Sequence, residues 1–195
     1  MLNSLPNLLT ISRILLIPLI VGMFWVPGDT ARWVTMALFV VAGVTDYLDG
    51  VAARSMGKTS SLGRFLDPVA DKLLVAAILM MLVGFDNVRG LVILPALVIL
   101  CREIMVSGLR EFLASIKVGM PVSKLAKWKT AAQMVALGFL IVGDAGPLFA
   151  GLTTTFIGET LLWIAALLTI VTGYDYLRAG LRHMAAGDET PGAGG

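Results

Sequence analysis

Residues 32–53 of the chain read RWVTMALFVVAGVTDYLDGVAA, an apolar run that ends in the two carboxylates of Asp46 and Asp49. The run is long enough to cross the hydrocarbon core of a bilayer, which takes about 20 mostly apolar residues in helical form. Its apolar residues are continuous rather than alternating, and an open sheet edge cannot lie in lipid, so a strand is disfavoured. The stretch therefore predicts a membrane helix that carries two acids near one end.

The whole chain has the composition of an integral membrane protein. Hydrophobic residues make up 57% and charged residues 14% of its 195 positions, whereas soluble domains have about 45–50% and about 25%. We predict an all-α bundle of six transmembrane helices in a single membrane domain, residues 1–182, followed by a flexible tail, residues 183–195. The six apolar stretches are Leu8–Val26, Arg32–Ala53, Leu66–Phe85, Gly90–Leu109, Lys127–Val142 and Thr155–Leu177.

The charge distribution predicts the orientation and excludes several classes of protein. Of the fifteen Lys and Arg residues, only Arg32 and Arg89 fall at the loops of one face. An excess of Lys and Arg marks the cytoplasmic side, so both termini are predicted to be cytoplasmic. A net charge of +2 is too small to indicate nucleic-acid binding. The single cysteine, Cys101, excludes an internal disulfide and a zinc site built from thiolates.

Four aspartates gather where the second apolar stretch leaves the membrane and the third re-enters it. Asp46 and Asp49 are three residues apart, and Asp67 and Asp71 are four apart, so each pair shares one face of a helix. A short basic loop makes the two helices antiparallel neighbours, and the two faces can therefore converge. Four carboxylates repel one another unless cations lie among them, and oxygen-only ligands favour Mg²⁺ or Mn²⁺ over zinc. Two such ions could clamp a diphosphate.

Other residues in this segment suit a ligand that carries phosphates. Gly50 and Gly63 have no side chain, so a nucleotide or its phosphates can approach the backbone closely. Arg54, one turn beyond Gly50, can hold a phosphate oxygen.

Structural explanations stay open for the acids taken one at a time. Asp67 precedes a proline and fits a helix N-cap. Asp49 can pair with Arg54, and Asp71 can pair with its neighbour Lys72 or with Arg64. For the whole set together a functional site is favoured, because ionisable residues inside a membrane are expensive to bury.

The acids, glycines and arginine stand in the pattern D-x2-D-G-x2-A-R-x8-G-x3-D-x3-D, which is matched at every position from Asp46 to Asp71. This pattern resembles the signature of the CDP-alcohol phosphatidyltransferases, membrane enzymes that move a phosphatidyl group from CDP-diacylglycerol to an alcohol and release CMP. Segments that begin at Asn7, Arg102 and Lys127 resemble bacterial members whose acceptor is glycerol 3-phosphate. The resemblance implies a homodimer among the lipids of the bacterial inner membrane, with its active site on the cytoplasmic side.

The resemblance also implies a role for each matched residue. Asp46, Asp49 and Asp67 would bind metal ions, Mg²⁺ or Mn²⁺, and Asp71 would complete the metal site and act as the general base. The residues implied to lie against the CDP moiety are Asp49, Gly50, Arg54 and Gly63, with Thr59 and Ser60 of the same loop near the ribose or phosphates.

A cationic pocket is expected beside the acids, because glycerol 3-phosphate is a dianion near neutral pH. Arg102 and Arg110 are eight residues apart and can face a shared cleft from one helix. Lys127 and Lys129 begin the next apolar stretch. We predict that these four cations bind the acceptor phosphate and that Glu103 orients an arginine.

Several alternatives stay open at this level. The basic side chains can instead snorkel to lipid headgroups, and Arg13 can pair with either an acid or a lipid phosphate. A cationic cleft does not separate glycerol phosphate from inositol phosphate as acceptor. A cation or proton transporter is a more distant alternative, because transporter sites usually lie at the bilayer midplane, whereas these acids gather near one face.

Overall fold

The computed structural model describes residues 5–56, 61–116 and 124–188, and most of these residues are helical. Two single 3-10 turns, η1 (Gly90–Val92) and η2 (Gly143–Ala145), occur in the connections. No β-strand lies within the described ranges, which confirms the predicted all-α class. The six α-helices of these ranges are α1 (Leu5–Met23), α2 (Asp29–Met56), α3 (Ser61–Gly84), α4 (Ile93–Ser115), α5 (Lys124–Val142) and α6 (Thr154–Asp188).

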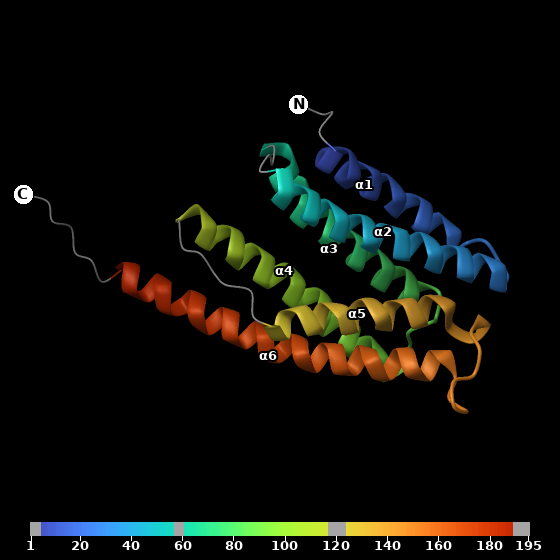
Figure 1. The fold of residues 1–195 in the computed structure, drawn as a ribbon. Helices are drawn as coiled ribbons and strands as arrows, with labels where there is room; N and C mark the ends of the chain where they lie inside the picture. Colours follow the sequence, from blue (N-terminus) through green and yellow to red (C-terminus); the bar gives the residue numbers. More distant parts are fainter. Residues whose placement is uncertain (1–4, 57–60, 117–123, 189–195) are drawn as a thin grey trace, which may run out of the picture.

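The helices form one bundle made of two groups (Figure 1). Helix α1 packs against α2 and α3, and α6 packs against both α4 and α5. Contacts of α2 with α5 and of α3 with α4 join the groups. Helix α6 runs to Asp188, so the helical part of the chain extends past residue 182, where the tail was predicted to begin.

Helix α6 approaches both of its neighbours through glycines. A Cβ atom added at Gly158 would lie 2.8 Å from Leu140 of α5, and one added at Gly173 would lie 3.0 Å from Arg102 of α4. A larger residue at either position would require the neighbouring side chain to shift, and at Gly158 the main chain of Leu140 is also close, with its N atom at 3.1 Å. The absence of a side chain at Gly173 thus leaves room for a charged side chain to run along α6.

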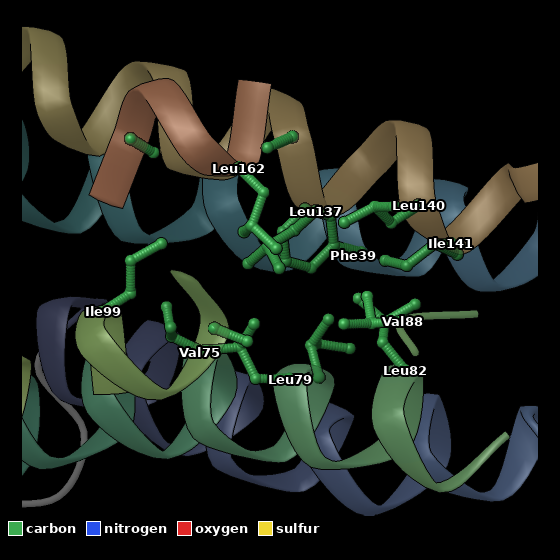
Figure 2. Close-up of a cluster of buried hydrophobic side chains, with 14 of the residues drawn as sticks. Phe39, Val75, Leu79, Leu82, Val88, Ile99, Leu137, Leu140, Ile141 and Leu162 are labelled. Carbon is green, nitrogen blue, oxygen red and sulfur yellow. The ribbon is translucent and has the colours of Figure 1, made fainter. Parts of the chain in front are cut away.

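The core between the two groups is apolar and tightly packed. Because lipid is as apolar as these side chains, close packing rather than removal from water is expected to hold the helices together. The buried side chains of this core come from all six helices, beginning with Ile20 of α1. The members labelled in Figure 2 are Phe39, Val75, Leu79, Leu82, Val88, Ile99, Leu137, Leu140, Ile141 and Leu162.

Four segments of the described chain are long and apolar enough to span a membrane: Asp29–Leu48, Gly90–Ser115, Leu125–Ala145 and Thr154–Arg178. For the other two helices, the residues of α1 whose side chains are described give the apolar segment Leu9–Met23, and α3 carries charged residues in its first half. The chain is therefore a multi-pass membrane protein, while six crossings and cytoplasmic termini stay predictions.

Side chains from other parts of the chain satisfy carbonyl groups at the C-terminal end of α5. The last four carbonyls of a helix have no partner within it. Asn87 Nδ2 donates to the carbonyl of Leu140 at 3.1 Å, and Arg32 Nη1 donates to that of Val142 at 3.4 Å. Gly143 follows with φ +53°, and a Cβ atom there would lie 2.5 Å from Arg32 Nη1. This end of the bundle is thus tied together by polar groups that bond the backbone.

Candidate functional site

A cavity of about 660 Å³ opens among the helices. Asp46 lies fourteen residues after Arg32 in α2, or about 21 Å along the helix at 1.5 Å per residue. The cavity therefore lies toward the end of the bundle opposite the bonded carbonyls of α5. Each of the six helices contributes to its wall: Arg13 from α1, Asp46 from α2, Asp71 from α3, Arg102 from α4, Lys127 from α5 and Tyr176 from α6.

A second hollow of about 450 Å³ is continuous with this cavity, because the two share several wall residues. Asp46, Asp71 and Arg110 belong to both, and Ser107 and Glu111 of α4 border only the second. Together they give one polar recess that is large enough for a nucleotide and a small phosphorylated alcohol.

Two of the four predicted metal ligands, Asp46 and Asp71, face this recess. Their side chains are 48% and 40% exposed, so both carboxylates are open to the recess. Asp46 Oδ1 lies 2.5 Å from Nη1 of Arg13, whose side chain is 1% exposed. Asp71 Oδ2 lies 2.8 Å from Lys72 Nζ. Of the alternatives open for Arg13, pairing with an acid is confirmed, and so is the pair between Asp71 and Lys72.

Glu103 is the centre of a buried ion cluster in the lining of the recess. Its carboxylate is only 8% exposed, and a charge so deeply buried is retained only when it is paired. Lys129 Nζ and Arg102 Nη1, the latter at 3.3 Å, both donate to Oε1. Lys72 Nζ lies 2.8 Å from Oε2. One carboxylate of α4 therefore collects cations from α3, α4 and α5, in agreement with the prediction that Glu103 orients an arginine.

The guanidinium of Arg102 is fixed against α6. Its Nη2 donates to Thr172 Oγ1 at 3.1 Å, and its Cζ lies 5.6 Å from the centre of the Tyr176 ring, within the range of a cation–π contact. The side chain runs past Gly173, where an added Cβ would lie 3.3 Å from Arg102 Nε. Arg102 borders the recess, but most of its surface is used in these internal contacts.

Arg110 and Lys127 differ from Arg102 and Lys129, because both are exposed and both border the recess. Neither forms an ion pair with another described residue. They come from different helices, α4 and α5, and lie in the same wall as Asp71. An anion in the recess therefore meets two cations whose charge is not already neutralised by a described partner.

The donor set at the acid side fits a hard divalent cation. The carboxylates of Asp46 and Asp71 supply oxygen atoms, and no histidine or cysteine borders the recess among the described residues. Such oxygen ligands suit Mg²⁺ or Mn²⁺. The described side chains contain no group of three acids, histidines or cysteines close enough to hold a metal.

The other predicted site residues fall outside what the structure describes in full. Asp49, Gly50 and Arg54 are in α2, and Gly63 and Asp67 are in α3, but only their helical backbone is described. The loop residues Thr59 and Ser60 lie outside the described residues.

Sequence reasoning missed the part played by Lys72 and by α6. Lys72 was considered only as a neighbour of Asp71, although a lysine inside an apolar stretch is itself a signal. Thr172 and Tyr176 carry no such signal, because a threonine and a tyrosine are common in membrane helices. Their contact with Arg102 depends on the packing of α4 against α6.

Comparison with known proteins identifies what the chain resembles. A family model described as CDP-alcohol phosphatidyltransferase matches residues 3–171. A protein of Rickettsia typhi is 50% identical over 177 residues, which cover 91% of this chain and 97% of the relative. One of Haemophilus influenzae is 40% identical, with 90% and 92% covered, and one of Cereibacter sphaeroides is 38% identical, with 93% and 97% covered. All three are named CDP-diacylglycerol–glycerol-3-phosphate 3-phosphatidyltransferase.

Proposed function

Because the chain belongs to the CDP-alcohol phosphatidyltransferase family, we propose that it transfers the phosphatidyl group of CDP-diacylglycerol to glycerol 3-phosphate, giving phosphatidylglycerol phosphate and CMP. Membership of a family of transferases favours an enzyme over the transporter considered above. The choice of acceptor follows the names of relatives that are up to 50% identical over most of the chain.

The observation that carries this proposal is one recess whose lining contains both carboxylates and cations. Asp46 and Asp71 supply the acid side, and Arg110 and Lys127 supply cations that have no described ion-pair partner. A dianionic acceptor phosphate gains two charge-assisted contacts from Arg110 and Lys127. Arg102 and Lys129 also line the recess and add positive potential to it.

The carboxylates are proposed to hold two divalent cations, Mg²⁺ or Mn²⁺. Asp46 and Asp71 would be joined by Asp49 and Asp67, which lie three residues after Asp46 and four before Asp71 on the same helices. When bound, the ions would neutralise the diphosphate and polarise its phosphorus. Gly50, Arg54 and Gly63, together with Thr59 and Ser60, are proposed to border the CDP moiety.

The chemical step is proposed to be an in-line displacement at the phosphorus next to the diacylglycerol. Arg110 and Lys127 hold the acceptor phosphate and so orient its primary hydroxyl toward Asp71. Asp71 accepts the hydroxyl proton while the hydroxyl oxygen forms the new bond to phosphorus. The bond from that phosphorus to the CMP oxygen breaks, and CMP leaves with the electron pair.

The membrane placement extends the same proposal. The recess would open to the cytoplasm of a bacterial inner membrane, where the water-soluble glycerol 3-phosphate is available, while the acyl chains of CDP-diacylglycerol stay in lipid. The six-helix arrangement predicted from the sequence would put all Lys and Arg residues except Arg32 and Arg89 toward this side. A homodimer is proposed from the family resemblance alone.

A transfer assay tests the reaction and the acceptor together. Purified protein would receive CDP-diacylglycerol and Mg²⁺ with labelled glycerol 3-phosphate in one tube and labelled inositol phosphate in another. We expect lipid-soluble label from glycerol 3-phosphate alone, with one CMP released per lipid formed. Lipid-soluble label from inositol phosphate would support the same type of reaction but contradict glycerol 3-phosphate as the acceptor. Label from neither acceptor would overturn the proposal.

A further inference from the structure

Lys72 stands between two carboxylates that compete for its charge. Its Nζ lies 2.8 Å from Asp71 Oδ2 and 2.8 Å from Glu103 Oε2. An ammonium has three hydrogens and can donate to both at once. The proposed reaction uses Asp71 but gives no task to Glu103, although Glu103 is the better buried of the two acids.

The surroundings of Glu103 explain why Lys72 does not pair with Asp71 alone. Lys129 and Arg102 both bond Oε1, which leaves Oε2 to Lys72. Loss of that bond would leave a buried carboxylate oxygen without its cation, which is costly in a low-dielectric interior. Lys72 is about one-third exposed and lies at the edge of the recess, so it has room to shift toward either acid.

A cation that pairs with Asp71 competes with a metal ion for the same carboxylate. The more completely Lys72 pairs with Asp71, the weaker the binding of a divalent cation there becomes. We propose that Glu103 is a positioning residue that draws Lys72 partly away from Asp71 and so keeps the Asp71 carboxylate open to a divalent cation. This inference rests on the metal site of the proposed function.

The test is the affinity of the purified full chain for Mn²⁺ alone, measured by electron paramagnetic resonance without lipid or acceptor. Glu103→Gln keeps the size of the side chain and removes its charge. We expect the Mn²⁺ dissociation constant to rise about three- to tenfold, the size of a redistributed ion pair at a partly exposed site. Glu159→Gln on α6 removes one negative charge outside the described recess and serves as the matched control, with an unchanged constant.

A double-mutant cycle separates positioning from a general electrostatic effect. Lys72→Met removes the competing cation, so we expect tighter Mn²⁺ binding than in the wild type. In this background Glu103→Gln should leave the constant unchanged, because no lysine remains to be redistributed. An equal loss of affinity with and without Lys72 would mean that Glu103 acts only through its charge, and it would overturn the inference.

A second variant and the wild-type measurement together separate a folding defect, the loss of the metal site and the loss of the role of Glu103. If Glu103→Gln does not fold because Lys129 is left buried and unpaired, the double variant Glu103→Gln with Lys129→Met restores neutrality and still leaves Lys72 to Asp71. The same rise in the Mn²⁺ constant is expected from it, and an unchanged constant overturns the inference. A wild-type chain that binds no Mn²⁺ would overturn the metal site itself, whereas wild-type binding that Glu103→Gln leaves unaltered would overturn only the role of Glu103.

Discussion

The two ends of the bundle use their polar side chains in opposite ways. At the C-terminal end of α5, Asn87 and Arg32 donate to main-chain carbonyls and so complete the backbone hydrogen bonding of a helix end. At the recess, Arg13, Lys72 and Glu103 bond other charged side chains instead. At the α5 end the polar groups serve only to stabilise the fold. At the recess, half-exposed carboxylates and exposed cations remain accessible to a ligand.

The difference indicates where substitutions should change chemistry and where they should change stability. A group that bonds the backbone contributes to the folded state alone. A group in the recess contributes to ligand binding and, through its neighbours, to the balance of charge.

Removal of divalent cations should have the largest effect. We expect EDTA to abolish transfer activity and added Mg²⁺ or Mn²⁺ to restore it, while Ca²⁺, which prefers more ligands and a looser geometry, should not. The thermal unfolding midpoint should change little, because the carboxylates of Asp46 and Asp71 already have cationic partners in Arg13 and Lys72. Full activity in EDTA would contradict the metal assignment.

Asp71→Asn should lower turnover by about a thousandfold, within the range that a general base contributes. The substitution keeps the shape of the side chain, so insertion and folding should be retained. Turnover of labelled glycerol 3-phosphate and the thermal unfolding midpoint would be measured on the same preparation. A near-normal rate in a folded Asp71→Asn protein would remove Asp71 from the chemical step.

Arg110→Ala and Lys127→Ala should each raise the KM for glycerol 3-phosphate about ten- to a hundredfold, with a smaller effect on kcat. A hydrogen bond to a charged group is worth about 1.5–3 kcal/mol, which corresponds to this range. Initial rates at varied acceptor and saturating CDP-diacylglycerol would measure both constants. An unchanged KM in both variants would mean that the acceptor phosphate binds elsewhere.

Asn87→Ala should have the smallest effect on the enzyme and act on stability alone. It removes the donor to the Leu140 carbonyl, at a cost of about 1 kcal/mol. The thermal unfolding midpoint should fall by about 2–4 °C for a chain of this size, with kcat and KM unchanged. A loss of activity in this variant without a loss of stability would contradict the view that polar groups at this end of the bundle affect stability alone.

Much of the site could be predicted from local spacing. Acids three and four residues apart share a helix face, and a short loop brings neighbouring helices together, which predicts that Asp46 and Asp71 face one recess. The cations Arg102, Arg110 and Lys127 were expected beside them for another reason, because the implied acceptor, glycerol 3-phosphate, is a dianion. The number of helices could also be predicted from the sequence, because each apolar stretch corresponds to one α-helix of the described chain.

What could not be predicted is which cation pairs with which acid. Four basic residues looked equivalent as phosphate ligands, yet Arg102 and Lys129 both pair with Glu103, whereas Arg110 and Lys127 are exposed and pair with no described acid. That choice depends on how deeply each side chain is buried when α3, α4 and α5 pack together. Helix periodicity reports the face of a residue but not its depth.

The wall of the recess has a consequence for how the protein is made. Every helix from α1 to α6 supplies a residue to it, from Arg13 near the start of the chain to Tyr176 near its end. A chain that is still emerging from the ribosome lacks α6, and with it the groups that fix Arg102 in place. The recess is therefore completed only when the last helix has entered the membrane, and a partly inserted chain has no finished site with which to consume its lipid precursor.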